Sequence, residues 1–362
     1  MPIRLLTTLI ILSTLVLMLL VGPLLTPIPK LETQPAAQLA SPTSQFVDVA
    51  GYTLHYDQRR QSSDADAAVS YVLLHGFIGN TFAWRQVLDE LTQPANINDV
   101  NTDNVSETTV SETTVDETTV DNVKAINVNA VAYDRLGFGL SARPLRNSWS
   151  RGANPYTFEA QQTRLLELVA ALELTGEVIL VGHDTGAALA LALAEHNPER
   201  FAGVVLVAPV PEVTSNLRGL WRLLIRTPQV DRLGPLFMRQ LAGGPGENML
   251  RSSLPDPDSI SSEVIEGYRQ NTQVDNWDKS LWELSRASTN AVSPTRTPKE
   301  IPVLVIASRD DQLVPFASSQ ALARDLAAPL VNLAECGHLP QEVCPQALSQ
   351  AMTNWVTDTV LD

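Results

Sequence analysis

The stretch "VILVGHDTGAALALALAEH", residues 178–196, places a carboxylate between two glycines where the sequence pattern changes. The apolar run that ends at Gly182 favours a strand, and the alanine- and leucine-rich run after Gly186 favours a helix. A strand, the pattern Gly-x-nucleophile-x-Gly and a helix form a nucleophile elbow, which holds the central side chain at the carboxyl edge of a parallel sheet. The sequence therefore predicts that Asp184 is a nucleophile.

A carboxylate nucleophile suits different reactions from a serine hydroxyl. Serine must lose a proton before it attacks, whereas aspartate is already an anion. Asp184 could displace a halide or open an epoxide at an sp³ carbon, which would leave an ester on the enzyme. The alternative is that Asp184 only caps the helix that begins at Thr185, since aspartate is favoured at that position.

The flanking sequence predicts the elements that position this elbow. Strands alternate with helices, which implies a parallel sheet with both faces covered. Residues 211–298 contain no apolar strand and predict a helical cap inserted between two strands. The predicted strands are two short ones around Gly51 and those at 67–76, 128–133, 177–181, 201–209, 301–311 and 330–338, with helices at 81–91, 157–174 and 341–358.

Residues 96–124 break this alternation. They contain "SETTVSETTVDETTVD", a five-residue repeat that fits neither a helix nor a strand and is too polar to build a core. We interpret the segment as an acidic surface loop inserted into the fold. Calcium binding is the alternative, but the segment lacks the glycine of a calcium loop.

The N-terminus predicts a membrane anchor. Residues 3–25 are apolar apart from Arg4 and a few hydroxyl-bearing residues. Within it, the stretch from Leu5 to Val21 is near the lower limit of the roughly 17–25 residues that span a bilayer, and longer than the apolar core of about 7–15 residues in a cleaved signal. We expect residues 1–25 to be a single-pass anchor and residues 26–44 a linker, with the catalytic part on the non-cytoplasmic side. A cleaved signal, giving a secreted or periplasmic protein, is the alternative.

The composition excludes two classes of site. The chain has 40 acidic and 25 basic residues, a formal net charge of −15, which argues against nucleic acid because phosphates require clustered Lys and Arg. Cys336 and Cys344 lack the ligand spacing of a zinc site, and we expect no metal and no organic cofactor. Idle thiols are the default expectation for this pair, and a disulfide between them is the alternative.

From about Phe46 to the C-terminus, the chain resembles the α/β-hydrolase family. The resemblance implies a mostly parallel eight-stranded sheet with helices on both faces, a core of residues 45–210 and 299–362, and a cap of residues 211–298. Five motifs in order carry it: "HGF" at 75–77, "DRLGFGLSARP" from Asp134, "GHDTG" at 182–186, "SRDDQLVP" at 308–315 and "CGHLPQEVCP" at 336–345.

The resemblance also implies roles for individual residues. Asp184 would be the nucleophile, His338 the base that activates water, and Asp311 the acid that orients the imidazole. The backbone N–H groups of Phe77 and Thr185 would stabilise the oxyanion formed when the ester is cleaved.

Some of these positions have competitors. Asp310 competes with Asp311 for the role of the acid, and Glu212 is a fallback because some dehalogenase-like members carry the acid there. Tyr268, in the cap, is a candidate to donate a hydrogen bond to substrate. Ordinary structural or surface roles are expected for His55, His75, Asp134, His183 and His196.

Members of the family with Asp at the elbow resemble epoxide hydrolases and hydrolytic dehalogenases. Thr185 stands where haloalkane dehalogenases usually have Trp, and this difference argues against a dehalogenase. Ile78 stands where epoxide hydrolases usually have Pro, and much of the remaining sequence is closer to serine members.

Three hypotheses remain open at this point. The first is a hydrolase that forms an ester on Asp184 and hydrolyses it with water activated by His338, with epoxide opening ahead of dehalogenation and a small apolar substrate. The second is a hydrolase of ester, acyl or haloalkanoic compounds. The third is a catalytically silent, membrane-tethered fold that binds a ligand or a partner.

Overall fold

The computed structural model describes most of the chain, with gaps. The predictions for the acidic repeat (96–124), for Ile78 and for Glu212 lie outside the described residues. The described residues are 3–62, 66–77, 79–93, 127–149, 154–210, 223, 225, 227–288 and 301–361.

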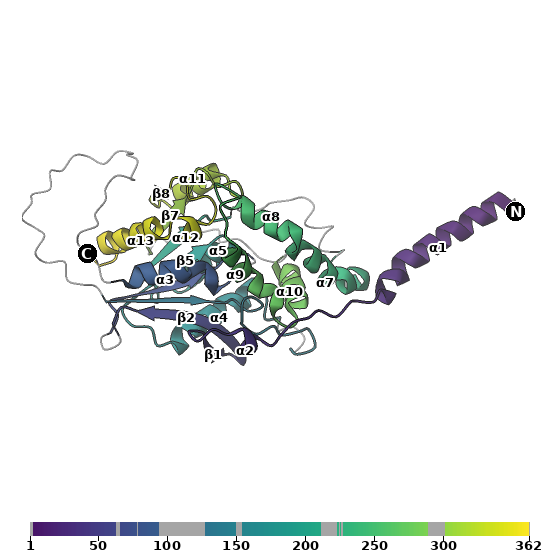
Figure 1. Cartoon of the computed structure of the whole chain (residues 1–362), viewed down its shortest axis with the longest axis horizontal. Helices are drawn as coiled ribbons and strands as arrows, with labels where there is room; N and C mark the ends of the chain where they lie inside the picture. Colours follow the sequence, from purple (N-terminus) through teal and green to yellow (C-terminus); the bar gives the residue numbers. More distant parts are fainter. Residues whose placement is uncertain are drawn as a thin grey trace, which may run out of the picture.

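Within these residues, eight strands form one sheet in the order β1-β2-β4-β3-β5-β6-β7-β8 (Figure 1). The pairs β1–β2 and β2–β4 are antiparallel, and every other neighbouring pair is parallel. The mostly parallel, eight-stranded sheet is therefore confirmed. The strands are β1 (Gln45–Val49), β2 (Tyr52–Arg60), β3 (Val69–Leu74), β4 (Val128–Tyr133), β5 (Glu177–His183), β6 (Gly203–Val207), β7 (Val303–Ala307) and β8 (Leu330–Asn332).

Helices cover both faces of this sheet, as predicted. One face packs against α3 (Arg85–Thr92) and α13 (Pro345–Thr359). The other packs against α4 (Phe158–Ala171) and α5 (Thr185–His196). All residues of β3, β6 and β7 are buried, because a parallel strand covered on both faces needs apolar side chains in both directions.

Several predicted elements differ in their bounds. The helix predicted at 81–91 begins as a 3₁₀ turn, η1 (Thr81–Trp84), capped by Asn80. The strand predicted at 330–338 is limited to β8. The helix predicted at 341–358 is two helices, α12 (Pro340–Val343) and α13, that meet at Cys344.

An inserted helical cap lies between β6 and β7. Asn80 of the core donates a hydrogen bond to the carbonyl of Gly267 at 2.9 Å, and a Cβ at position 267 would lie 2.3 Å from the Phe82 ring. The glycine therefore allows the cap to approach η1 closely. The cap helices are α7 (Pro228–Ala242), α8 (Gly244–Ser252), α9 (Ser262–Gln273) and α10 (Trp277–Ser288).

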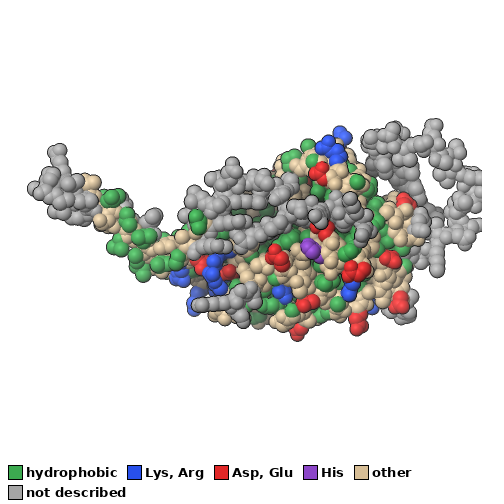
Figure 2. All heavy atoms as spheres, turned by 180° about the vertical axis from the view of Figure 1, so that it is seen from behind, with side chains coloured by type: hydrophobic (Ala, Val, Ile, Leu, Met, Phe, Trp, Pro, Cys, Tyr) green, Lys and Arg blue, Asp and Glu red, His purple; other side chains and the backbone are tan. Residues whose placement is uncertain are grey.

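The N-terminal segment forms α1 (Ile3–Leu25), which projects from the cap side of the molecule (Figure 1). Hydrophobic side chains gather along it (Figure 2), and Leu17 and Met18 are 60% and 64% exposed. Over the described residues, no helix combines the length and the apolar character needed to cross a bilayer. The predicted membrane anchor therefore finds no support in the structure.

The segment that follows α1 runs along the cap. It includes α2 (Ala36–Leu39). The backbone of Gln34 bonds to Gln273 and Asp275, each at 2.9 Å, and the Thr33 hydroxyl donates to the Asp275 carboxylate at 2.6 Å. The segment predicted as a linker thus contacts the ends of α9 and α10.

Candidate active site

The elbow between β5 and α5 forces Asp184 into a strained backbone conformation. Its φ is +52° and its ψ is −118°, a combination that L residues rarely adopt. A Cβ at Gly182 would lie 2.4 Å from the carbonyl oxygen of Gly186, and one at Gly186 would lie 2.7 Å from the carbonyl oxygen of Leu74. Both glycines are needed for this close packing around the turn.

The Asp184 carboxylate does not cap α5, so the alternative that this residue serves only as a helix cap is wrong. Its side chain makes no capping hydrogen bond. Instead, Oδ2 accepts a hydrogen bond from the backbone N–H of Phe77 at 2.7 Å. Phe77 follows β3, the strand next to β5, and a Cβ at Gly76 would lie 2.7 Å from the same Oδ2. The sheet therefore brings the predicted oxyanion donor directly to the predicted nucleophile.

His338 and Asp311 come from the loops that follow β8 and β7. His338 Nδ1 lies 2.8 Å from Asp311 Oδ2, and the other Asp311 oxygen accepts from the backbone N–H groups of Leu313 and Val314. Asp310 instead accepts from the N–H of Glu335 at 2.8 Å. Of the two competing aspartates, the structure brings Asp311 to the imidazole.

A cavity of about 270 Å³ lies between the core and the cap. Asp184, His338 and Phe77 line its core side, together with Tyr268 from α9. Most of the remaining lining is apolar, which suits an apolar organic ligand. It comes from Val210, Ala242, Met249, Leu250, Ile265, Leu313, Val314 and Leu339.

Tyr268 contributes its ring to the cavity wall. The ring packs edge-on against Phe82, with the centroids 6.0 Å apart. Burial raises the pKa of the Tyr268 hydroxyl, which is close to the side chain of Gln341. The hydroxyl therefore keeps its proton and can donate a hydrogen bond.

The two buried histidines next to the site are neutral. Burial, followed by the neighbouring His338, lowers the pKa of His183 to about 4, and its Nε2 donates to the backbone carbonyl of His338 at 2.9 Å. Burial and then Arg135 lower the pKa of His75 to about 3, and its Nε2 accepts from the N–H of Arg135. Both residues hold backbone segments of the site in place.

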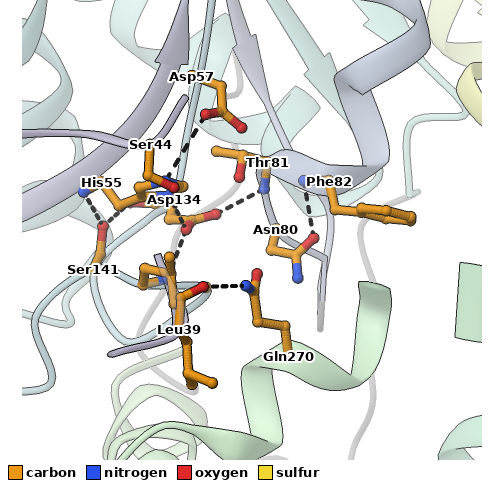
Figure 3. Close-up of polar contacts among 12 residues, drawn as sticks. Leu39, Ser44, His55, Asp57, Asn80, Thr81, Phe82, Asp134, Ser141 and Gln270 are labelled. Carbon is orange, nitrogen blue, oxygen red and sulfur yellow. Dashed lines mark hydrogen bonds and ion pairs between the residues drawn. The ribbon is translucent and has the colours of Figure 1, made fainter. Parts of the chain in front are cut away.

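Asp134 holds the turn after β4 (Figure 3). Its carboxylate accepts from the N–H groups of Thr81 and Leu140 and from His55 Nδ1, each at 2.7 Å. Burial alone would raise the pKa of Asp134, but the charge and hydrogen bond of His55 outweigh it and lower the pKa. His55, expected to be an ordinary packing or surface residue, is a buried ion-pair partner 2% exposed.

Two features of the site differ from the sequence-based expectations. Cys336 and Cys344 form a disulfide, so the alternative holds and the default expectation of idle thiols was wrong. This bond closes the loop that carries His338, and the position of both cysteines around that residue was the available signal. The feature that sequence reasoning missed is Arg135, which reaches the elbow from the end of β4 and donates to the Thr185 hydroxyl at 3.2 Å.

The sequence of this chain is similar to proteins of known family. Residues 71–351 match the alpha/beta hydrolase family. The 2-hydroxymuconate semialdehyde hydrolase of Pseudomonas sp. (strain CF600) is 27% identical over 216 residues, which cover 58% of this chain and 70% of that protein.

Solved structures share the fold at lower identity. A thermophilic esterase from Thermogutta terrifontis has a TM-score of 0.61 at 20% identity, over 87% of this chain and 99% of the esterase. The epoxide hydrolase CorEH has a TM-score of 0.60 at 17% identity, with the same coverage of 87% and 99%.

Proposed function

We propose, because this chain belongs to the alpha/beta hydrolase family, that it opens an epoxide by attack of Asp184 and releases a diol by hydrolysis of the resulting ester. One observation carries the proposal. The side chain at the elbow is a carboxylate that makes no cap bond to α5 and lines the same apolar cavity as His338.

In the first step, the two oxygens of Asp184 have different roles. Oδ2 is held by the N–H of Phe77, which leaves Oδ1 to attack a carbon of the epoxide. A C–O bond forms as the strained ring C–O bond breaks, and the electron pair goes to the epoxide oxygen. Tyr268 donates a hydrogen bond to this oxygen while it takes a proton from water.

In the second step, His338 activates water. Its Nδ1 is bonded to Asp311, so Nε2 is the nitrogen that accepts a proton from water. Hydroxide adds to the ester carbonyl, and the negative charge develops on Oδ2 beside the N–H groups of Phe77 and Thr185. The ester C–O bond then breaks, and the diol leaves with the proton from His338. The remaining carboxylic acid of Asp184 gives its proton to the hydroxide left when the epoxide oxygen was protonated, so Asp184 regains its charge with one oxygen from water.

Acyl transfer is the second candidate. A relative named as a hydrolase of 2-hydroxymuconate semialdehyde, at 27% identity, favours it. Attack of Asp184 on an acyl carbon would give a mixed anhydride, which is the less natural route for a carboxylate. A haloalkanoic substrate would follow the same first step as an epoxide, with halide as the leaving group.

Covalent trapping tests the proposal. His338→Gln incubated with a panel of epoxides should accumulate an adduct on Asp184, detected by intact mass and peptide mapping, while Asp184→Asn should give none. Single turnover of the wild type in ¹⁸O-water should label Asp184 and leave the first diol unlabelled. Esterase activity with no adduct from epoxides would favour the acyl alternative, and its survival in Asp184→Ala would show that acyl transfer proceeds without attack by Asp184. Ligand binding without any turnover would favour a silent binding protein.

The competing aspartates provide a matched control. With His338 in place, Asp311→Asn should slow hydrolysis of the ester intermediate in a single turnover by about 10²–10⁴-fold, the usual contribution of a positioned acid–base group. Asp310→Asn, one residue away and bonded to Glu335, should leave this rate within about twofold of the wild type. Equal effects of the two substitutions would contradict the assignment of Asp311.

A further inference from the structure

Arg135 is a buried cation at the elbow. It follows β4, which pairs with β3, and β3 pairs in turn with β5, the strand that carries Asp184. Only 6% of the residue is exposed. Burying a charge in this way is costly unless the surrounding structure compensates for it.

The hydrogen bonds that the Arg135 side chain donates within the described residues lie at the catalytic turn. Its Nη2 donates to the carbonyl of Gly76 at 3.3 Å and to the hydroxyl of Thr185 at 3.2 Å. These residues directly precede Phe77 and directly follow Asp184, so one guanidinium connects both sides of the predicted oxyanion site. Both acceptors are neutral oxygens, which do not balance the charge.

Two residues oppose the effect of burial on the guanidinium. Burial lowers the pKa of Arg135, while Tyr133 and then Asp184 favour its charged form. Because burial also raises the pKa of Tyr133 and keeps its hydroxyl protonated, Asp184 is the anion of the two. Its Cζ also lies 5.0 Å from the centroid of the Phe138 ring, a geometry that adds a weaker cation–π contribution.

We propose that Arg135 is a positioning residue, whose buried charge is balanced by an anionic Asp184 and whose guanidinium fixes the turn between Gly76 and Thr185. The elbow is then built for a permanent anion and not for a neutral hydroxyl. The proposal rests on the proposed function in taking Asp184 as the nucleophile, but the charge coupling is measurable without any substrate.

A double-mutant cycle in urea unfolding tests this coupling. Arg135→Met and Asp184→Asn should each lower the urea midpoint, and the double variant should lose less than the sum, because neither charge is then left unpaired. Arg143 is the matched control, since it follows the same strand but donates to the carbonyls of Gly139 and Ser141. Arg143→Met combined with Asp184→Asn should be additive.

Additive losses in both cycles would overturn the proposal. If Arg135→Met does not fold, Arg135→Lys and Arg135→Gln replace it: lysine should keep the coupling to Asp184 and glutamine should lose it. Equal coupling in the two variants would also overturn it.

A kinetic measurement separates this proposal from the proposed function. In the His338→Gln background, Arg135→Gln should slow adduct formation at neutral pH by about 10–100-fold, because the turn that carries Asp184 is no longer fixed, and Arg135→Lys should restore most of the rate. An unchanged rate in Arg135→Gln would contradict the proposal. Absence of adducts in every variant, together with a coupled unfolding cycle, would refute epoxide opening and leave the charge pair standing.

Discussion

At residue 55, a buried imidazole lies against two carboxylates that the proposed chemistry does not use. His55 Nδ1 is 2.7 Å from Asp134, and Nε2 is 4.0 Å from Asp57. Burial opposes protonation of His55, but Asp134 and then Asp57 outweigh it and raise the pKa above its ordinary value of 6.5. Because Asp134 also holds the N–H of Thr81 and, through the N–H of Leu140, the turn that begins at Arg135, this pair supports one wall of the site.

The raised pKa of His55 predicts how stability depends on pH. The folded state binds the His55 proton more tightly than the unfolded state. The stability that His55 contributes is therefore complete below pH 6.5 and is lost as pH rises through the folded pKa. The lowered pKa of Asp134 matters at acidic pH, where the stability that its carboxylate contributes is lost below about pH 3.8. The free energy of unfolding should therefore fall above pH 6.5, by at most about 1.4 kcal/mol per pH unit.

Urea unfolding between pH 6 and pH 9 measures this slope. His55→Gln should flatten it, and Asp134→Asn should flatten it while lowering stability overall. His196, on α5, provides the control, since its Nδ1 bonds only to the backbone carbonyl of Ala192 within its own helix. A slope that persists in His55→Gln and disappears in His196→Gln would refute the assignment.

Among the elements, the loop that carries His338 is fixed at several points. The Cys336–Cys344 disulfide closes it, and the N–H of His338 donates to the Ser253 carbonyl of the cap at 2.8 Å. On α12, Glu342 forms a bidentate pair with Arg85 at 2.6 and 2.8 Å. The imidazole therefore depends on a closed loop as well as on Asp311.

Reduction of the disulfide should loosen this loop. Closing a ring of this length stabilises a protein by about 2–3 kcal/mol in the chain-entropy description, so reductant should lower the free energy of unfolding by that amount. With His338 present, the ester intermediate on Asp184 should also persist longer in the reduced protein, because the imidazole is less well placed. The Cys336→Ser/Cys344→Ser variant should match the reduced wild type and be insensitive to reductant. A reductant effect that remains in this variant would have another origin.

The elements that the sequence predicts best are those with local signals. The elbow at Asp184 needs only a strand, two glycines and a helix within one short stretch, and the parallel strands appear as continuous apolar runs. The order of the family motifs along the chain allowed Asp311 and His338 to be assigned to the site. Arg135 and the His55–Asp134 pair were missed because their partners come from other strands, and no spacing along the chain encodes those contacts.

On the scale of the whole molecule, cap and core share the site. The core supplies Asp184, His338 and the N–H of Phe77, while α8 and α9 supply much of the apolar wall. The sequence predicted a helical cap but not the shape of its cavity, because the wall depends on which face each helix turns inward. The predicted membrane span over α1 finds no support within the residues that the structure describes.

We propose that the whole chain works outside the cytoplasm, and the disulfide next to His338 carries this prediction. Reducing systems keep cytosolic thiols free, whereas disulfides form and persist in secreted and periplasmic proteins. If cells expressing the full chain are quenched in acid and alkylated, both Cys336 and Cys344 should be protected until reductant is added, and a C-terminal alkaline phosphatase fusion should be active. Cys336→Ser leaves Cys344 without its partner and should label without reductant, which controls for burial. Free thiols in the wild type together with an inactive fusion would place the chain in the cytoplasm and contradict the proposal.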